Sequence, residues 1–305
     1  MKQPLAFWNG RFVPARSVGI SLVDTGFVLG VAVAEQVRTF GGKLFHLDDH
    51  LARLARALDL IGVDPGMDRP RLAEAAYELV RHNHALLAPG DDLGLSIVVT
   101  PGLYRPYAGA GPSQPTVCLH TYPLPFGLWA RKYREGQALV VSRVQQIPAA
   151  CWPPELKCRS RMHYYLADRE ADRRDPGARA VLLDAQGFVT EASTANLLMV
   201  RTGEGLVGPP RGTVLPGITE AVVRQLADTL GISSTYRHLA PADVASADEI
   251  LLTSTPWCLL PATRFDGRPV GAGVPGPVFQ RLLSAWNELV GLDIVAQAER
   301  FADRV

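Results

Sequence analysis

Lysine is scarce in this chain of 305 residues, and one lysine lies in a setting that favours chemistry. Lys157 is followed by Arg159 and Arg161, at the point where a helix is predicted to begin. Neighbouring cations and burial favour the neutral amine, which is the form that acts as a nucleophile or base. This is the setting that a Schiff-base lysine needs. Without further context, a solvated lysine at a helix start is the better interpretation. The other lysines are Lys2, Lys43 and Lys132.

Three later stretches could supply partners for this lysine. Glu191 follows a predicted strand among small and apolar residues, where a carboxylate is either a paired structural acid or a partner for a buried cationic nitrogen. Residues 214–219 run into a predicted helix, whose first backbone N–H groups suit a phosphate. Thr253–Thr255 end a strand with three hydroxyl groups. Helix capping and turn formation are the alternatives for Thr219 and Thr255.

Regular elements must position these groups. Apolar residues at helical spacing predict a helix that begins at Lys157 and runs through Ala167 to about Arg173. A second amphipathic helix is predicted over 217–230, and a buried strand over 250–253. Between the two helices we expect a hairpin of 178–184 with 188–190, then a strand over 196–200, and near the end of the chain a helix over 278–289.

The first half of the chain alternates hairpins with helices. Asn9-Gly10 predicts a type I′ turn within residues 6–14. Gly41-Gly42 predicts a second turn, from a strand over 26–40 into residues 43–46. The other predicted elements are a strand over 17–23, helices over 47–61 and 69–86, and strands over 93–100 and 116–122.

The stretch 101–112 is too rich in Gly and Pro for a helix or strand, so it is predicted to be a loop. Arg105 and Tyr107 lie in this loop and are candidates for facing a substrate pocket. A surface loop with incidental aromatic residues is the alternative.

A proline-rich stretch near the middle of the chain, 122–126, is the best candidate for a linker between domains. We expect an N-terminal domain over 1–122, a linker over 123–134 and a C-terminal domain over 135–305. The mixture of antiparallel hairpins and intervening helices indicates the α+β class, not a doubly wound sheet.

The composition is that of a globular protein, with 47% apolar and 20% charged residues. A formal net charge of +1 gives no reason to expect nucleic acid or an anionic membrane as a partner. No stretch is long and apolar enough for a membrane span or a signal peptide, so we expect a cytoplasmic protein. The four cysteines lack the paired spacing of a metal site, and we expect reduced thiols and no metal.

Five stretches, in the same order along the chain, resemble the class IV aminotransferases, the pyridoxal-phosphate enzymes of fold type IV. That family comprises branched-chain aminotransferases, D-amino acid aminotransferases and aminodeoxychorismate lyases. Five collinear matches are hard to reach by chance. The stretches are His50–Leu54, Lys157 with Leu166–Ala167, Gly187–Glu191 with Ala195–Leu197, Leu215–Thr219, and Ala247–Ile250 with Thr253–Thr255.

The resemblance implies a two-domain α+β fold, with an N-terminal α/β sandwich-like domain and a larger C-terminal pseudo-barrel domain that binds pyridoxal 5′-phosphate. It makes Lys157 the catalytic lysine that carries this cofactor as a Schiff base. Glu191 becomes the acid that pairs with the protonated pyridine nitrogen and strengthens the ring as an electron sink.

By the same resemblance, Arg53 would hold the cofactor phosphate. The backbone at Ile218 and Thr219, with the hydroxyl of Thr255, would complete the phosphate site. Members of this family form dimers or higher assemblies, so the resemblance also implies a homodimer.

Some positions depart from the family pattern. Ser160, Arg161 and Met162 stand where aminotransferases carry Asn and often the Tyr that supports the cofactor phenolate oxygen, which leaves that partner unassigned. Arg161 is closer to the aminodeoxychorismate lyases. Residues 100–102 read Thr-Pro-Gly instead of Thr-Arg-Gly, so the carboxylate-binding arginine of D-amino acid aminotransferases is missing there. Arg38, Arg105, Tyr107 or Arg161 could contact substrate instead.

The leading hypothesis is an aminotransferase that moves an amino group between a small, branched-chain-like amino acid and a 2-oxo acid by a ping-pong mechanism. The alternatives are an aminodeoxychorismate lyase that releases pyruvate and p-aminobenzoate, and a D-amino acid aminotransferase. A binding protein on a degenerate scaffold is a third class, and the joint presence of Lys157, Glu191 and Arg53 argues against it.

Overall fold

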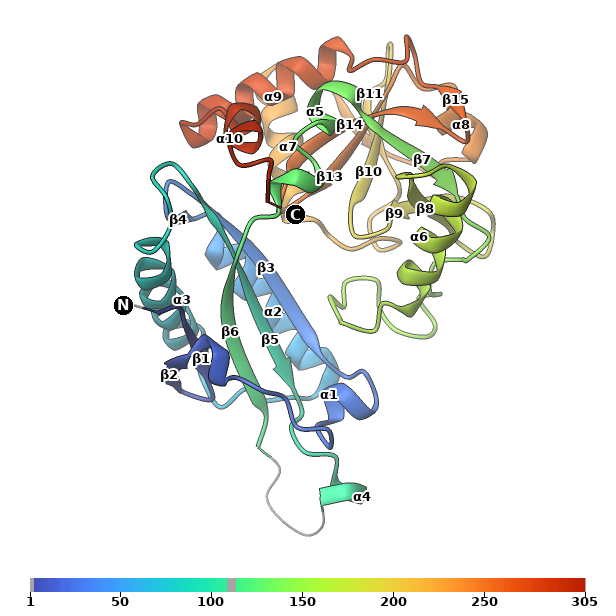
Figure 1. Cartoon of the computed structure of the whole chain (residues 1–305). Coiled ribbons are helices and arrows are strands. Elements are labelled where there is room, and N and C mark those ends of the chain that lie inside the picture. Colours follow the sequence, from blue (N-terminus) through green and yellow to red (C-terminus); the bar gives the residue numbers. More distant parts are fainter. Residues whose placement is uncertain (1–2, 109–113, 305) are drawn as a thin grey trace. The chain divides into compact units, whose positions relative to one another are not determined.

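The computed structural model describes residues 3–108 and 114–304, which form two compact units (Figure 1). Unit 1 comprises Met1–Leu124 and Leu156–Ser160, and unit 2 comprises Pro125–Glu155 and Arg161–Val305. The chain therefore returns to unit 1 for five residues, and Lys157 lies among them. No helix among the described residues is long and apolar enough to cross a membrane.

Unit 1 is built on an antiparallel sheet with the strand order β2-β1-β6-β5-β3-β4. The Asn9-Gly10 hairpin is confirmed, and both residues have positive φ (46° and 89°), as a type I′ turn requires. The Gly41-Gly42 hairpin is also confirmed. The strands are β1 (Leu5–Trp8), β2 (Arg11–Pro14), β3 (Val33–Phe40), β4 (Lys43–Leu44), β5 (Leu93–Thr100) and β6 (Thr116–Pro123).

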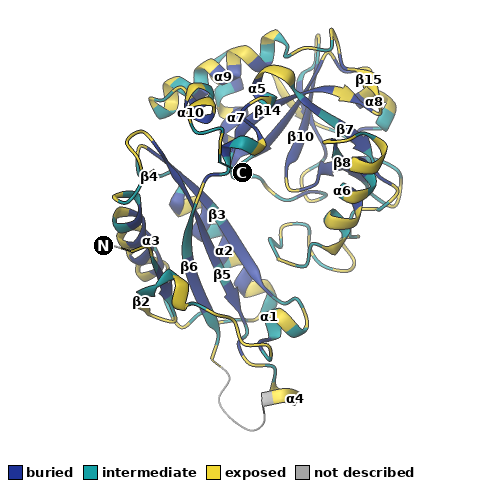
Figure 2. Cartoon of the chain, viewed as in Figure 1, coloured by how far each residue is buried: buried dark blue, intermediate teal, exposed yellow. Residues whose placement is uncertain are grey.

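Two long helices, α2 (Leu47–Ile61) and α3 (Arg69–His84), cover one face of this sheet with their apolar sides. Gly62 ends α2 in the left-handed conformation, and the Asp68 carboxylate caps the start of α3 by accepting from the Arg71 N–H. The core lies between helices and sheet, where the strands are dark in Figure 2. Its centre includes Phe7, Val37, Leu51, Leu54, Leu79, Leu95, Ile97 and Leu119.

The predicted strand over 17–23 is wrong. A 3-10 turn, η1 (Ala15–Ser17), precedes residues that form no strand, and Ile20 and Leu22 point outward. The predicted strand over 26–40 begins only at Val33, because the short helix α1 (Thr25–Val28) comes first. The alternating pattern failed here because its apolar residues lie on an exposed surface and not against a core.

A buried carboxylate holds this irregular segment in place. Asp24 accepts hydrogen bonds from the Gly26 N–H (2.7 Å), the Thr100 hydroxyl (3.0 Å) and the Thr116 hydroxyl (2.8 Å). The predicted loop 101–112 contains the helical turn α4 (Arg105–Ala108), which is exposed in Figure 2, and its residues 109–112 lie outside the described part of the chain.

Unit 2 contains a larger mixed sheet with the order β12-β11-β10-β13-β14-β7-β8-β9, and β15 pairs with β14. A bridge between Ala192 and Ala195 brings the last strand back to β10, so the sheet curls toward a barrel. The strands are β7 (Gln137–Val141), β8 (Arg179–Leu183), β9 (Val189–Ala192), β10 (Asn196–Arg201), β11 (Gly205–Gly208), β12 (Ser234–Tyr236), β13 (Glu249–Ser254), β14 (Cys258–Phe265) and β15 (Arg268–Pro269).

The helices of unit 2 pack on this curled sheet. Helix α6 (Met162–Arg174) covers β7 and β8 through a small alanine-rich core, and α7 (Ile218–Thr229) packs with α9 (Pro277–Val290) against β13 and β14. The predicted helices over 217–230 and 278–289 are thereby confirmed. The shorter elements are η2 (Phe126–Leu128), α5 (Lys132–Glu135), α8 (Pro241–Ala245) and α10 (Ile294–Arg300).

The prediction that Lys157 begins a helix is wrong. The backbone at Lys157 lies along the open edge of β3, where the Ala34 N–H donates to the Lys157 carbonyl (2.9 Å) and the Arg159 N–H donates to the Ala32 carbonyl (2.8 Å). Helix α6 begins five residues later, at Met162. Pairing with a strand edge uses the backbone groups that a helix would need, so the sheet overrides the helical apolar spacing.

Residues 123–134, which were predicted to form a linker, do not form a separate segment between the two compact units. From Pro125 onward these residues belong to unit 2, and they form η2 and α5. The division into one domain over 1–122 and another over 135–305 remains a prediction.

Candidate active site

The segment that carries Lys157 is fixed to unit 1 by a side chain as well as by its backbone. The Ser160 hydroxyl donates to the Gly30 carbonyl (2.7 Å). Gly30 has φ of +72°, and a Cβ there would lie 3.0 Å from the Ser160 Oγ. A departure from the family pattern at Ser160 therefore has a structural role beside the lysine.

A buried carboxylate on β3 pairs with two basic side chains of α2. The Arg53 Nε and Nη2 donate to the two oxygens of Glu35 (2.7 and 2.8 Å), and the His50 Nδ1 lies 2.7 Å from the Glu35 Oε2. Burial alone would raise the pKa of Glu35, but the Arg53 charge, the hydrogen bonds from Arg53 and His50, and the Lys157 charge outweigh it and hold the pKa at about 2.

The same burial lowers the pKa of His50, although the hydrogen bond to Glu35 opposes the shift. His50 is therefore neutral near neutral pH and donates its Nδ1–H to the carboxylate. Lys157 contributes to both shifts through its charge, which places its amine beside the Glu35–His50–Arg53 cluster.

Glu191 lies on β9 of unit 2, 5% exposed. The Tyr164 hydroxyl from α6 donates to its Oε1, and so does the Gln146 Nε2 (2.6 Å). Burial and the nearby Glu191 charge raise the pKa of Tyr164, so the phenol stays protonated and remains a donor.

Two of the predicted phosphate-binding residues of unit 2, Ile218 and Thr219, lie at the start of α7. This helix begins at Ile218, and its N-cap residue, Gly217, has no side chain that could cap the first N–H groups. The buried acid in the first turn, Glu220, accepts from the Arg224 Nε (2.8 Å), so it is neutralised within the helix. The N-terminus therefore keeps unsatisfied donors and the positive end of the helix dipole, which suit an anion.

Asn196 joins this helix start to the end of β13. It pairs with Thr253 in the sheet, and its Nδ2 donates to the Leu215 carbonyl (2.8 Å). A Cβ at Gly217 would lie 1.9 Å from the Asn196 Oδ1, so only glycine fits there. Thr255 lies just beyond the end of β13, two residues after Thr253. Its contact with a phosphate, like that of Thr219, remains a proposal.

The proposed substrate residues lie in varied surroundings. Arg38 is 2% exposed, with its guanidinium over the Phe40 ring (4.2 Å) and its Nε donating to the Thr39 carbonyl. Arg105 and Tyr107 lie on the exposed turn α4, and Arg161 is the residue before α6. Their contacts with substrate remain proposals.

The structure thus groups the predicted residues within each unit. In unit 1, Lys157 lies within electrostatic reach of the Glu35–Arg53 pair. In unit 2, Asn196 joins the segment before α7 to Thr253 at the end of β13. Sequence reasoning missed Glu35, Tyr164 and Gln146. Glu35 carried a signal, since it is the one acid in the otherwise apolar start of β3 and a buried acid needs a partner.

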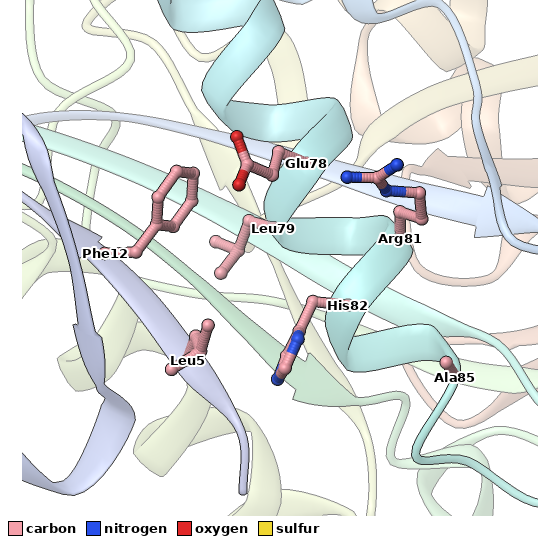
Figure 3. A pocket seen from close by; sticks show the side chains of 7 residues that line it. All are labelled: Leu5, Phe12, Glu78, Leu79, Arg81, His82 and Ala85. Atoms are coloured by element: carbon pink, nitrogen blue, oxygen red, sulfur yellow. The ribbon is translucent and has the colours of Figure 1, made fainter. Parts of the chain in front are cut away.

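A separate hollow in unit 1 involves none of these residues. It lies between the first hairpin and α3, with an apolar floor of Leu5, Phe12 and Leu79 and with Glu78 and His82 at its rim (Figure 3). Its polar groups do not converge on a common point in this view, so it is not a second candidate site.

Comparison with known families agrees with the geometry. The sequence profile of the family Amino-transferase class IV matches residues 32–265 of this chain. The chain belongs to the class IV aminotransferases. The aminotransferase prediction made from the five motifs is therefore confirmed.

Relatives of this class IV aminotransferase cover nearly its whole length. The D-alanine aminotransferase of Bacillus licheniformis is 28% identical over 280 residues, 91% of this chain and 94% of the relative. A putative branched-chain-amino-acid aminotransferase of Methanocaldococcus jannaschii is 27% identical over 286 residues, 93% of this chain and 95% of the relative.

Solved structures show the same fold. A branched-chain amino acid aminotransferase from T.th., complexed with N-(5′-phosphopyridoxyl)-L-glutamate, superposes with a TM-score of 0.84 at 25% identity over 95% of each chain. The branched-chain enzyme of Escherichia coli gives 0.87 at 24% identity, again over 95% of each chain. The predicted α+β fold of type IV is confirmed, and the curled sheet of unit 2 is its pseudo-barrel.

Proposed function

We propose that this class IV aminotransferase uses pyridoxal 5′-phosphate to move an amino group between a small, branched-chain-like amino acid and a 2-oxo acid. The main support for the proposal is that the curled sheet of unit 2 holds a buried carboxylate, Glu191, and packs against α7, whose N-terminus is uncapped. Pyridoxal phosphate has a basic ring nitrogen and a phosphate, and these two features of unit 2 complement them.

The residues fit the cofactor chemically. Glu191 would hold the ring nitrogen, and the first N–H groups of α7 with the hydroxyls of Thr219 and Thr255 would hold the phosphate. The buried Thr253 hydroxyl has no hydrogen-bond partner among the described residues, which leaves a further polar atom near this site to be satisfied. Lys157 would hold the aldehyde carbon.

When bound, the cofactor supplies an electron-withdrawing ring that stabilises negative charge on the substrate α-carbon. Glu191 would accept a hydrogen bond from the protonated ring nitrogen. Lys157 would supply the amine that removes the proton from the substrate α-carbon. Arg53 remains a proposed phosphate ligand, and Glu35 fixes the orientation of its guanidinium.

The proposed substrate class is supported by the relatives and by one position at which the chain differs from the D-amino acid enzymes. Branched-chain enzymes are among both the sequence and the structural relatives. The arginine that marks D-amino acid enzymes is replaced by Pro101 in a turn whose next residue, Gly102, accepts from the Thr25 N–H and hydroxyl (2.7 Å each). A D-amino acid aminotransferase stays the second candidate, because the D-alanine enzyme is a full-length relative.

The half-reaction tests this proposal. Purified protein loaded with pyridoxal phosphate is mixed with each enantiomer of leucine, alanine and glutamate, without an acceptor. We expect L-leucine to convert the cofactor to its amine form fastest, and 2-oxoglutarate to restore the starting spectrum. D-alanine as the fastest donor would support the second candidate. Release of pyruvate and p-aminobenzoate from aminodeoxychorismate, without any half-reaction, would establish the lyase instead.

We also propose a homodimer. Four exposed apolar side chains lie within residues 20–29 of unit 1, and the exposed Leu103 pairs with Asp24 of the same segment. Monomeric proteins rarely expose apolar patches of this kind, and a second copy of the chain is the partner that the family resemblance implies. We call this patch the apolar rim, and it consists of Ile20, Leu22, Phe27, Leu29 and Leu103.

A further inference from the structure

Two donors converge on the Glu191 carboxylate from different parts of unit 2. Tyr164 reaches it from the first turn of α6, and Gln146 reaches it from the segment between β7 and α6. Both bond to the same oxygen, Oε1, and the Gln146 Nε2 also lies 3.3 Å from the Tyr164 hydroxyl. The three side chains form one hydrogen-bonded group.

The direction of each bond follows from its surroundings. The side-chain Oε1 of Gln146 accepts from the backbone N–H of Ile147 (3.0 Å). The backbone N–H of Gln146 donates to the Leu183 carbonyl (2.9 Å). The amide orientation is therefore fixed by its own backbone, and its Nε2 is the donor to Glu191. An ionised carboxylate only accepts, so the Tyr164 hydroxyl must donate as well.

We propose that Tyr164 and Gln146 are positioning residues that hold Glu191 in the orientation in which it pairs with the cofactor ring nitrogen. This inference rests on the proposed function. Tyr164 would then have a different role from the family tyrosine that is missing from residues 160–162. The Tyr164 O–H is committed to Glu191, so it is not the partner of the cofactor phenolate oxygen.

The geometry explains why two donors are needed. Glu191 sits on a strand next to the tight turn at Ala192–Ala195, and a glutamate has three rotatable side-chain bonds. Hydrogen bonds to an ionised group are the stronger kind, and two of them on one oxygen leave the carboxylate a single orientation. The high pKa of Tyr164 keeps this arrangement intact throughout the neutral range.

The test replaces Tyr164 with Phe and measures the affinity of the cofactor-free protein for pyridoxal phosphate by fluorescence titration. We expect binding about tenfold weaker, the usual effect of losing a hydrogen bond to a charged group. Gln146→Leu should act in the same direction. The matched control is Tyr165→Phe, because Tyr165 is the next residue on α6, is 58% exposed and makes a ring contact with Arg169.

A double mutant separates positioning from a general structural role. In a Glu191→Gln background, Tyr164→Phe should weaken binding by less than about twofold, because its effect passes through the Glu191 charge. An equal loss in both backgrounds, or a Tyr164→Phe protein that binds as the wild type does, would show that Tyr164 does not position Glu191. Unfolding curves of each cofactor-free variant report folding directly. A wild-type chain that binds no pyridoxal phosphate would overturn the proposed function together with this inference.

Discussion

At the scale of single residues, buried charges in pairs govern both stability and the site. Glu35 is 1% exposed and stays ionised because Arg53 and His50 satisfy it. Removing one partner of such a pair leaves the other charge buried without compensation, which is strongly destabilising. The lysine proposed to carry the cofactor lies within electrostatic reach of this cluster. The Glu35–Arg53 pair therefore stabilises the part of the fold that holds this lysine.

Glu35→Gln should lower the free energy of unfolding by about 3 kcal/mol, because it removes the buried carboxylate charge to which the Arg53 guanidinium and the His50 ring are bonded. Urea denaturation monitored by circular dichroism measures this change. Glu74→Gln is the control, since that glutamate forms an exposed pair with Arg71 and should change stability by less than about 1 kcal/mol. Equal small effects would contradict the role of the buried pair.

The contribution of Glu35 also has a defined pH dependence. Its pKa falls from the ordinary 4.5 to about 2 on folding, so its ionised form stabilises the native state above pH 4.5. The stability difference between the wild type and Glu35→Gln should therefore stay constant above pH 4.5 and shrink as the pH falls toward 2. A difference that grows in that range would contradict the assignment.

The sequence allowed the candidate groups to be proposed, but not the contacts around them. Lys157, Glu191 and the start of α7 were proposed as site residues from residue type and motif order. Glu35, Tyr164 and Gln146 were not, because a hydrogen bond between α6, a connecting segment and β9 depends on tertiary packing. No local periodicity encodes such a contact between distant segments.

At the scale of elements, strand edges and helix ends position the site. Most helices and hairpins were predictable, because their apolar faces repeat at the correct period and their turns carry Asn-Gly or Gly-Gly. The segment around Lys157 was not, because it pairs with an open edge of β3 that lies more than a hundred residues earlier. Long-range pairing overrides local helix propensity there.

Arg159→Pro should displace Lys157, because proline cannot donate the backbone hydrogen bond to the Ala32 carbonyl (2.8 Å). We expect covalent attachment of the cofactor to fall by about tenfold or more, while the helical circular dichroism is retained. Arg159→Ala is the control. It keeps the N–H and loses the side-chain bond to the Ser96 hydroxyl, so it should retain attachment. Equal behaviour of the two variants would refute the strand-edge role.

Gly217→Ala should weaken phosphate binding, because its Cβ would lie 1.9 Å from the Asn196 Oδ1 and would push the α7 N-terminus away. Titration with pyridoxal phosphate should show an affinity about tenfold lower. Gly19→Ala serves as the control, since a Cβ there meets nothing within 4 Å. Unchanged affinity in Gly217→Ala would rule out the helix start as the phosphate site.

At the scale of the whole molecule, the proposed dimer depends on the apolar rim. Leu22 is 73% exposed and Phe27 is 61% exposed in the single chain. Leu22→Asp with Phe27→Asp should place two charges in the interface between copies and convert the dimer to a monomer, as measured by sedimentation velocity. Leu60→Asp, an exposed leucine on α2, is the control. A wild-type monomer, or a double variant that remains dimeric, would contradict the proposal.

Lys157, and no other lysine, is proposed to carry the cofactor. Lys132 is the natural competitor, because burial and the Arg179 charge lower its pKa and its amine donates to the Gln137 Oε1 (2.5 Å). Borohydride reduction of the pyridoxal-phosphate-loaded protein, followed by peptide mapping by mass spectrometry, distinguishes the four lysines directly. We predict the phosphopyridoxyl group on Lys157 alone. Its presence on Lys132, or on no lysine, would contradict the account.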